Sequence, residues 1–507
     1  MALALTGVAV GMFASSSAGA METPRLYQQF CAECHQADRL GGSGPALLPE
    51  SLGRMKAEQA ARVILEGRPA TQMLPYKDKM TPEEALALAQ WLLTPLDKPP
   101  VWGEAEIRAS HVILHPMESL PPQPVFAADP LNLFVVVEQG DHHFTLLDGD
   151  TLEPIGRFPT RMALHGGPKF TPDGRFVFFS SRDGWISKFD LHGLKLVAEI
   201  RVGVNTRNVA VSGDGKVVMA ANMLPHTLVI LDAETLALRQ VLPVADPGGA
   251  SSRVSAVYTA APRHSFVAAL KDLPQVWEIP YNDQAPAWGE ATGPREGGAL
   301  PVRRLAIPEP LDDFFFTADY ERLMGASREG GKGRVVHLGE GKAVADIPIS
   351  GMPHLGSGIL WERDGRTVMA TPNLKENAIT VLDAADWSLI QRIETLGPGF
   401  FMRGHEESPY VWTDNMLSPK YKDTVHVIDR QTLKIVKNIT PSPGKTAAHV
   451  EFTRDGRYVL LSVSEMEGEL VIYDAKTLDE VKRLPMKKPS GKYNIHNKIT
   501  RSSGTSH

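Results

Sequence analysis

The two cysteines of this chain of 507 residues, Cys31 and Cys34, are separated by two residues, and His35 follows them directly. Two thiols at this spacing followed by histidine are typical of covalent attachment of a c-type haem. The thiols add to the two vinyl groups, and the imidazole becomes an iron ligand. A redox dithiol would not need the histidine, and a zinc site would need further Cys or His ligands nearby. The motif therefore predicts one covalently bound haem c.

Loop histidines are the second group of residues that could do chemistry. His165 in RMALHGG, His354 in GMPHLG and His449 in KTAAH each stand just before a turn that contains Asp-Gly, and His405 in MRGH is a fourth candidate. Residues at equivalent places of a repeated unit point repeatedly toward one end of a ring, so these histidines could converge on one ligand. Most of the other histidines lie beside predicted strands or in turns and predict solvated or packed side chains.

Short helical patterns would position the haem motif within residues 21–99. One leads into the motif, a second covers residues 58–66, and a third opens at residues 81–84 with proline at its start. This order resembles class I cytochrome c domains, in which a methionine in the loop before the last helix is the second axial ligand. The resemblance implies Met73 for that role, with Met80 as the competing candidate. His–Met ligation raises the potential of a haem, which suits an electron carrier.

Residues 1–20 resemble a secretory leader, with an apolar stretch and a small-x-small cleavage site at Ala18-Gly19-Ala20, although a basic start is absent. A buried helix is the alternative. We expect export to the periplasm, because bacteria attach c-type haem outside the cytoplasm. No later apolar run is long enough to cross a membrane. The net charge of −6 argues against nucleic acid as a partner.

Beyond residue 100, which follows a Pro-rich linker, short β patterns repeat. Asp-Gly turns at residues 173–174, 214–215, 364–365 and 455–456 each precede a strand, a loop, a second strand that ends in Asp, a turn and a third strand. A period of roughly 40–50 residues with several strands is typical of β-propeller blades. With more degenerate copies the total is about eight, so residues 100–507 predict one propeller rather than independent β-sandwiches.

A cytochrome c domain followed by an eight-bladed propeller resembles the cytochrome cd1 family over nearly the full chain. The fold class is then multidomain: a small all-α class I cytochrome c domain and an all-β propeller of the cytochrome d1 type. The matching stretches are Asn132-Leu133-Phe134, Leu147-Asp148-Gly149-Asp150, the His165 segment, Ser181-Arg182-Asp183, Thr206-Arg207-Asn208-Val209, Met352-Pro353-His354 and Pro489-Ser490-Gly491-Lys492-Tyr493-Asn494.

The resemblance also implies a second cofactor site. It implies that the propeller binds one haem d1, or its dihydro precursor, without a covalent bond. His165 matches the proximal iron ligand of the family, and Arg182 and Arg207 match arginines that pair with carboxylates of the macrocycle. A guanidinium suits that role because it can hold a carboxylate through two hydrogen bonds.

Two activities occur in this family. One branch reduces nitrite to nitric oxide and uses two distal histidines as proton donors. Here His354 matches one of them, but the other falls on residues 309–313, EPLDD, where no histidine stands. A positioned acid typically contributes about 10²–10⁴-fold, so this departure should weaken nitrite reduction. The other branch dehydrogenates a propionate of dihydro-haem d1 to an acrylate, and the chain resembles it better through His449 and Tyr493, where the first branch tends to carry Gln and Phe.

Such a dehydrogenation removes two electrons and two protons. We expect the electrons to leave through haem c to a soluble c-type cytochrome or a similar acceptor. His449 is the expected first base, Tyr493 would position the propionate or relay the second proton, and His354 would ligate the distal face of the iron or join the relay. Alternatively, His449 and Tyr493 only hydrogen-bond carboxylates. A nitrite reductase that receives haem d1 is a further expected partner. A pure haem d1 carrier is the third alternative, although a carrier needs no electron outlet.

Overall fold

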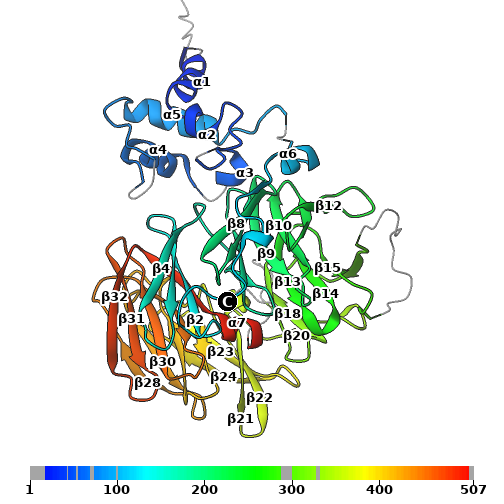
Figure 1. The fold of residues 1–507 in the computed structure, drawn as a ribbon, viewed down its shortest axis with the longest axis vertical. Helices are drawn as coiled ribbons and strands as arrows, with labels where there is room; N and C mark the ends of the chain where they lie inside the picture. The colour runs from blue at the N-terminus through cyan, green and yellow to red at the C-terminus, as the bar shows by residue number, and fades with distance from the viewer. Residues whose placement is uncertain are drawn as a thin grey trace, which may run out of the picture. The chain divides into compact units, whose positions relative to one another are not determined.

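The computed structural model describes residues 18–42, 44–52, 55–68, 73–98, 101–286, 300–326 and 332–501. The chain divides into two compact units, Met1–Pro100 and Val101–His507 (Figure 1). Residues 1–17 of the predicted leader lie outside the described ranges, and its last three residues begin the first helix. Within these ranges, no helix is long and apolar enough to cross a membrane.

The first unit is built from helices. They are α1 (Ala18–Phe30), α2 (Ala32–His35), α3 (Pro49–Leu52), α4 (Ala57–Glu66) and α5 (Pro82–Leu92). The start of α5 is fixed by a capping box, in which the backbone N–H of Glu84 donates to Thr81 Oγ1 at 3.2 Å and that of Thr81 donates to Glu84 Oε2 at 2.8 Å. The apolar faces of α1, α4 and α5 enclose one core, which includes Tyr27, Cys31 and Met80. The prediction of a small all-α domain is confirmed.

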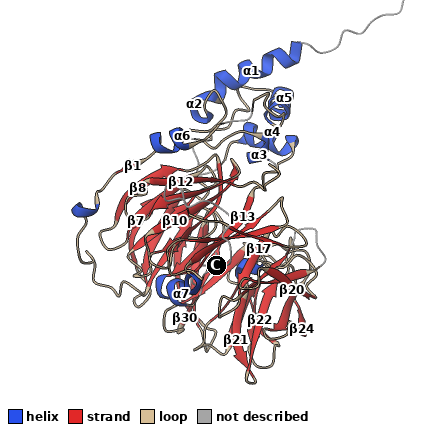
Figure 2. Ribbon diagram, turned by 90° about the vertical axis from the view of Figure 1, so that its right-hand side faces the viewer, coloured by secondary structure: helices blue, strands red, loops and turns tan. Residues whose placement is uncertain are grey.

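The second unit contains eight antiparallel sheets, whose strands are drawn in red in Figure 2. The first blade contains β33 (Pro489–Asn494), β2 (Leu133–Glu138), β3 (His143–Asp148) and β4 (Pro154–Pro159), and the second contains β5 (Lys169–Phe170), β6 (Phe176–Ser180), β7 (Trp185–Asp190), β8 (Lys195–Arg201) and the added edge strand β1 (Val112–Ile113). The third blade contains β9 (Asn205–Val211), β10 (Val217–Leu224), β11 (Thr227–Asp232) and β12 (Leu238–Pro243), and the fourth contains β13 (Val254–Ala260), β14 (Ser265–Leu270), β15 (Gln275–Pro280) and β16 (Arg303–Ala306).

The remaining four blades follow in chain order, and the prediction of an eight-bladed propeller is confirmed. The fifth blade contains β17 (Asp313–Phe316), β18 (Arg322–Ala326), β19 (Gly333–His337) and β20 (Lys342–Ile347), and the sixth contains β21 (Ile359–Arg363), β22 (Arg366–Pro372), β23 (Ala378–Asp383) and β24 (Leu389–Glu394). The seventh blade contains β25 (Met402–Gly404), β26 (Tyr410–Asp414), β27 (Val425–Asp429) and β28 (Ile435–Ile439), and the eighth contains β29 (Ala447–Phe452), β30 (Tyr458–Val463), β31 (Gly468–Asp474) and β32 (Glu480–Met486).

The edge strand that begins each blade lies on the inside of the ring. Contacts between these strands join β5 to β9, β9 to β13, β13 to β17, β21 to β25, β25 to β29 and β29 to β33. The single-turn helix η4 (Leu355–Ser357) contacts β17 and so continues the inner wall between the fifth and sixth blades. The loops before these strands, and those of their side chains that do not pack between blades, therefore lie beside a shared interior.

The ring is closed by the C-terminal strand. β33 pairs with β2, with Tyr493 opposite Val135, so the two ends of the unit complete one blade. Helix α7 (Ile495–Thr500), red in Figure 1, follows directly and packs against β2, β5 and β33. The side chain of Asn132 ties this junction, because its Oδ1 accepts hydrogen bonds from the backbone N–H of Arg454 and from Asn494 Nδ2, both at 3.1 Å.

The Asp-Gly turns join the first two strands of their blades. At residues 171–176, Thr171 Oγ1 donates to Asp173 Oδ1 at 2.5 Å, and the carboxylate also accepts the N–H of Arg175 at 3.1 Å. Gly174 has φ +74°, a left-handed conformation that other residues adopt at a cost. The same Ser/Thr-to-Asp bond recurs at Ser212 and Thr453, which explains the repeated sequence.

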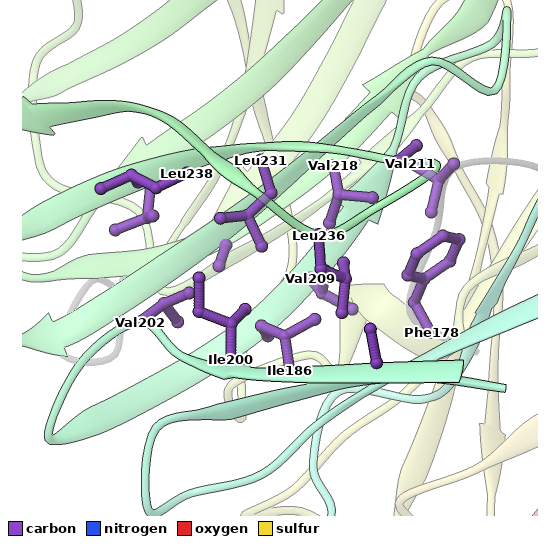
Figure 3. Packing of buried hydrophobic residues seen from close by; sticks show 14 of the residues in the cluster. Phe178, Ile186, Ile200, Val202, Val209, Val211, Val218, Leu231, Leu236 and Leu238 are labelled. Atoms are coloured by element: carbon purple, nitrogen blue, oxygen red, sulfur yellow. The ribbon is translucent and has the colours of Figure 1, made fainter. Parts of the chain in front are cut away.

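Apolar side chains fill the space between neighbouring blades. Figure 3 shows one such layer, in which Ile186 and Ile200 of the second blade face Val209, Val218 and Leu231 of the third. Each is at most 1% exposed, and burying a side chain of this size stabilises a fold by about 1.5–3 kcal/mol. These layers make the ring a rigid support for the groups on its inner wall.

Candidate active site

The haem-attachment motif lies at α2 in the first unit. Cys31 and His35 are buried, and Cys34 is half-buried. His35 Nδ1 lies 2.7 Å from the carbonyl oxygen of Pro45, which places the ring proton on Nδ1 and leaves Nε2 available for iron. Gly44 lies against the ring, since a Cβ at this position would be 2.6 Å from His35 Cε1. Two free thiols and an imidazole oriented in this way fit a covalently bound haem c.

The loop that carries Met73 is tied to this motif. Tyr76 donates its hydroxyl hydrogen to the carbonyl oxygen of Phe30, the residue before Cys31, at 2.9 Å. The carbonyl oxygen of Met73 accepts the N–H of Arg68 at 2.9 Å, so these two residues lie side by side. Met73 is half-buried, whereas Met80 is 4% exposed and packs in the helical core. Met73 as the second axial ligand stays a prediction.

In the second unit, His165 stands between two arginines. Its Nδ1 lies 2.7 Å from the carbonyl oxygen of Arg207 and donates to it, whereas Nε2 accepts from Arg182 Nη2 at 2.8 Å and from Arg207 Nη1 at 2.9 Å. This pattern requires a neutral imidazole with its lone pair on Nε2, the form that binds iron. Ala163, two residues earlier, has φ +50° and turns the segment toward the interior. A metal-binding nitrogen with two guanidinium groups beside it fits a tetrapyrrole that carries carboxylates.

His354 occupies the corresponding place of the sixth blade. An isolated bridge precedes each histidine, Leu164 with Ser181 and Pro353 with Asn373. His354 Nδ1 lies 2.5 Å from the carbonyl oxygen of Phe400. The pKa of His354 is lowered to about 4, mainly by burial, and the positive charge of Arg207 contributes in the same direction. This influence indicates that the His165 region and His354 border one interior.

His449 and Tyr493 lie on the inner strands of adjacent blades. The pairing of β29 with β30 shifts register between Ala448 and Val450, so His449 is the extra residue of a β-bulge, and its φ of +54° is left-handed. Bulges re-aim side chains, and such strain is frequent at functional sites. The His449 and Tyr493 rings meet edge to face with centroids 5.2 Å apart. The bulge thus turns the imidazole toward the phenol.

Burial controls the protonation of this pair. It lowers the pKa of His449 well below its ordinary value, and the positive charges of Lys492 and Arg403 act in the same direction. Burial also raises the pKa of the Tyr493 hydroxyl. At neutral pH His449 is therefore neutral and able to accept a proton, whereas Tyr493 keeps its proton and acts as a donor.

A row of rings joins the two histidines of this half. His354 lies 3.9 Å from Phe400, Phe400 lies 4.7 Å from Phe401, and Phe401 lies 4.6 Å from His449, measured between ring centroids. Asp414 holds this row of rings in place through the backbone N–H groups of three of its residues. One carboxylate oxygen accepts the N–H of Phe400 at 2.8 Å, and the other accepts those of Phe401 at 3.3 Å and His449 at 3.2 Å. The orientation of both histidines thus depends on one buried carboxylate.

Several charged residues of the interior escaped the sequence analysis. Besides Asp414, the buried members are Lys169, Arg403, Glu451, Lys492 and Lys498. Lys492 Nζ donates to the carbonyl oxygen of His449 and lies 3.5 Å from its Nδ1. Their sequence neighbours gave little signal, since Arg403 and Lys492 stand in short strands that are not apolar as a whole.

His405 does not join the other three candidates. It lines a surface cavity of about 480 Å³ together with Arg454, Asp455 and Arg501. Its Nε2 lies 3.2 Å from the carbonyl oxygen of Arg454. The imidazole packs under the turn of the eighth blade, because a Cβ on Gly456 would be 2.3 Å from its Nδ1. This packed role accounts for His405 without a ligand.

Comparison with known proteins gives two family matches. Residues 128–498 match the family described as "Cytochrome D1 heme domain", and residues 18–92 match "Cytochrome C oxidase, cbb3-type, subunit III". The first match spans almost the whole propeller, and the second spans the helical unit with the Cys31–His35 motif.

Individual relatives cover the chain from end to end. "Dihydro-heme d1 dehydrogenase" of Pseudomonas aeruginosa is 56% identical over 505 residues, which is 99% of this chain and 100% of that protein. "Nitrite reductase" of Stutzerimonas stutzeri is 24% identical over 562 aligned residues, 98% of this chain and 96% of that protein. A solved structure, "Dihydro-heme d1 dehydrogenase NirN in complex with DHE", superimposes with a TM-score of 0.88 at 57% identity and covers 94% of this chain and 99% of that one.

Proposed function

The chain belongs to the cytochrome d1 haem domain family, and from this premise we propose that it is the dehydrogenase that completes haem d1, oxidising a propionate side chain of dihydro-haem d1 to an acrylate. The observation that carries the proposal is the strained bulge at His449, which sets a neutral imidazole against the phenol of Tyr493 on the inner wall of the propeller. The 56% identity to a dihydro-heme d1 dehydrogenase supports it, against 24% to a nitrite reductase.

The substrate is held by residues of the second and third blades. His165 Nε2 binds the iron, and Arg182 and Arg207, which contact that nitrogen in this structure, turn to carboxylates of the ring. Both arginines keep their charge at any relevant pH. His165 keeps its proton on Nδ1, where the carbonyl oxygen of Arg207 holds it, so the ligand is neutral and fixed in orientation.

Residues of the sixth, eighth and first blades handle the protons. Formation of a C=C bond from CH2–CH2 releases two protons and two electrons. His449 accepts the first proton, since its imidazole is neutral, and Tyr493 positions the side chain and relays the second. His354, also neutral, contributes on the distal face of the macrocycle. Cys31, Cys34 and His35 would hold haem c, which would supply a one-electron outlet for the two electrons.

The setting of the reaction follows from these roles. We propose that the protein acts in the periplasm, that Met73 is the second ligand of the c haem, and that a soluble c-type cytochrome or a similar carrier accepts the electrons. A nitrite reductase is the proposed recipient of the finished haem d1. These assignments rest on the cytochrome c match of residues 18–92 and on the leader-like start of the sequence.

The test uses the full chain with haem c attached, loaded with dihydro-haem d1 and given a one-electron acceptor, while the d1 absorption spectrum is followed. We expect conversion by the wild type, and we expect His449→Ala to bind the substrate with an unchanged spectrum but not to convert it. His337→Ala, at the end of the third strand of the fifth blade, is the matched control and should convert normally.

Two other outcomes would replace the proposal. Rapid nitrite turnover with a reduced cytochrome, and no conversion of the precursor, would identify a nitrite reductase. Neither activity, together with release of haem d1 to a nitrite reductase, would identify a carrier. A His449→Ala variant that converts at the wild-type rate would remove this residue from the mechanism.

A further inference from the structure

Arg403 is a buried guanidinium whose hydrogen bonds are incomplete. It lies on β25, and its side chain is 9% exposed. Nη1 donates to the carbonyl oxygen of Met402 at 3.2 Å, and Nε lies 3.6 Å from Glu451 Oε2. Nη2 is buried and has no acceptor among the described residues. Since buried donors are nearly always satisfied, this nitrogen points to an acceptor that the chain itself does not supply.

The surroundings of Arg403 are those of the proposed chemistry. β25, β29 and β33 contact one another in sequence around the inner wall, and they carry Arg403, His449 and Tyr493 in turn. The charge of Arg403 lowers the pKa values of His449, Tyr493 and also His354, so all three lie within its electrostatic reach. A group that binds Nη2 is therefore held beside the base and the phenol.

Glu451 does not satisfy this guanidinium. Its Oε1 accepts the N–H of Phe452 at 3.0 Å and Asn497 Nδ2 at 3.1 Å. Its negative charge also acts on Lys492 and Lys498. The ion pair of Nε with Glu451 Oε2 at 3.6 Å leaves Nη2 without an acceptor within the part of the chain that the structure describes, and a carboxylate is the group that a guanidinium fork matches best.

We propose that Arg403 is the binding residue for the carboxylate of the propionate that is dehydrogenated. The inference rests on the proposed function and names the subsite for the reacting group. A propionate fixed by its carboxylate places its two methylene carbons between Arg403 and the His449–Tyr493 pair, where proximity favours proton removal. The guanidinium also stabilises the negative charge that develops next to the carboxylate as the first proton leaves.

The experiment compares binding of two ligands, dihydro-haem d1 and its methyl ester at the reacting propionate. Each is titrated by absorption into the full chain with haem c attached, with no electron acceptor present. We expect the wild type to bind the acid about 10- to 100-fold more tightly than the ester, because a charge-assisted hydrogen bond is lost in the ester. Arg403→Gln should bind both with the affinity that the wild type has for the ester. Arg392→Gln, on the outer strand β24, is the control and should behave as wild type.

A second variant covers the case in which Arg403→Gln does not fold. Glu451→Gln removes the neighbouring carboxylate and keeps the guanidinium, so it should bind the acid at least as tightly as wild type and retain discrimination against the ester. If the wild type or Glu451→Gln binds acid and ester alike, or if Arg403→Gln still discriminates between them, the assignment is wrong. Because no turnover is needed, a wild type that discriminates but never converts would overturn the proposed function and leave the subsite in place.

Discussion

Asp414→Asn tests whether the buried carboxylate behind the ring row positions both histidines. Asp414 is fully buried, and burial raises its pKa from 3.8 to about 6 although backbone N–H groups lower it. This difference corresponds to a cost of about 3 kcal/mol for the ionised form at pH 7. The amide of Asp414→Asn carries no charge, so the cost of burying the ionised form is absent, but its NH2 group faces backbone N–H donors. Each backbone N–H that loses its acceptor costs about 1–3 kcal/mol. We therefore expect the two effects to offset each other to within about 2 kcal/mol at pH 7.

Activity should respond far more than stability. The amide can accept at one oxygen only, so either the Phe400 segment or the His449 segment must shift. A displacement of about 1 Å at a reacting group costs on the order of 10²-fold in rate. Conversion of bound dihydro-haem d1 by Asp414→Asn should thus fall about 10- to 100-fold with little change in substrate affinity. Asp429→Asn is the control, since Asp429 also accepts two backbone N–H groups, but at an outer turn of the same blade.

The pH dependence of the unfolding free energy tests the raised pKa of Asp414 independently of activity. Because its pKa is higher in the folded chain, protonation stabilises the fold, and this stabilisation is complete below pH 3.8 and lost as the pH rises through about 6. Between pH 7 and pH 5 the wild type should gain about 1.3 kcal/mol relative to Asp414→Asn, measured as the difference in unfolding free energy. A variant with wild-type rate would refute the positioning role, and a difference that does not vary with pH would refute the buried ionisation.

Four further predictions follow from the described contacts. Tyr493→Phe should slow conversion about 10- to 100-fold without weakening substrate binding, as single-turnover kinetics would report. Met73→Ala should lower the haem c potential in a redox titration by on the order of 0.1 V, whereas Met80→Ala should keep the potential and lower stability by about 2–3 kcal/mol. Gly44→Ala should reduce covalent haem content, because the new Cβ would lie 2.6 Å from Cε1 of His35 in the attachment motif. Asn132→Ala should cost about 2–3 kcal/mol in thermal unfolding, since two donors at the ring closure lose their acceptor.

The fold was predictable where local chemistry repeats. The Asp-Gly turns revealed the blades because the glycine at 174 and its counterparts adopt left-handed backbone that few other residues tolerate. The haem-attachment motif was equally easy to predict, since its two thiols and its imidazole stand within five residues of one another in the sequence. Pairing of β33 with β2 has no such local mark, because the two strands are separated by most of the chain.

The interior charges were hidden for a physical reason. Arg403 and Lys492 stand in short β patterns where alternate residues normally face solvent, and only the ring arrangement turns them inward. Asp414 ends β26 much as other aspartates end outer strands, yet it is buried and faces the chain of another blade. The left-handed backbone at His449 gives only a weak sequence signal, since histidine is enriched in this conformation but still adopts it uncommonly.

β33 combines two tasks in six residues: it seals the first blade, and it bears Tyr493. Because a chain is synthesised from its N-terminal end, the strands of the other seven blades are all present before this strand is made. Until β33 is made, the ring is open and Tyr493 is absent. A partly synthesised chain therefore has neither the closed ring nor the phenol of the proposed site. Any truncation upstream of Pro489 would remove both the strand that closes the ring and the side chain of Tyr493. Binding of the substrate in the proposed site would then require the chain through β33.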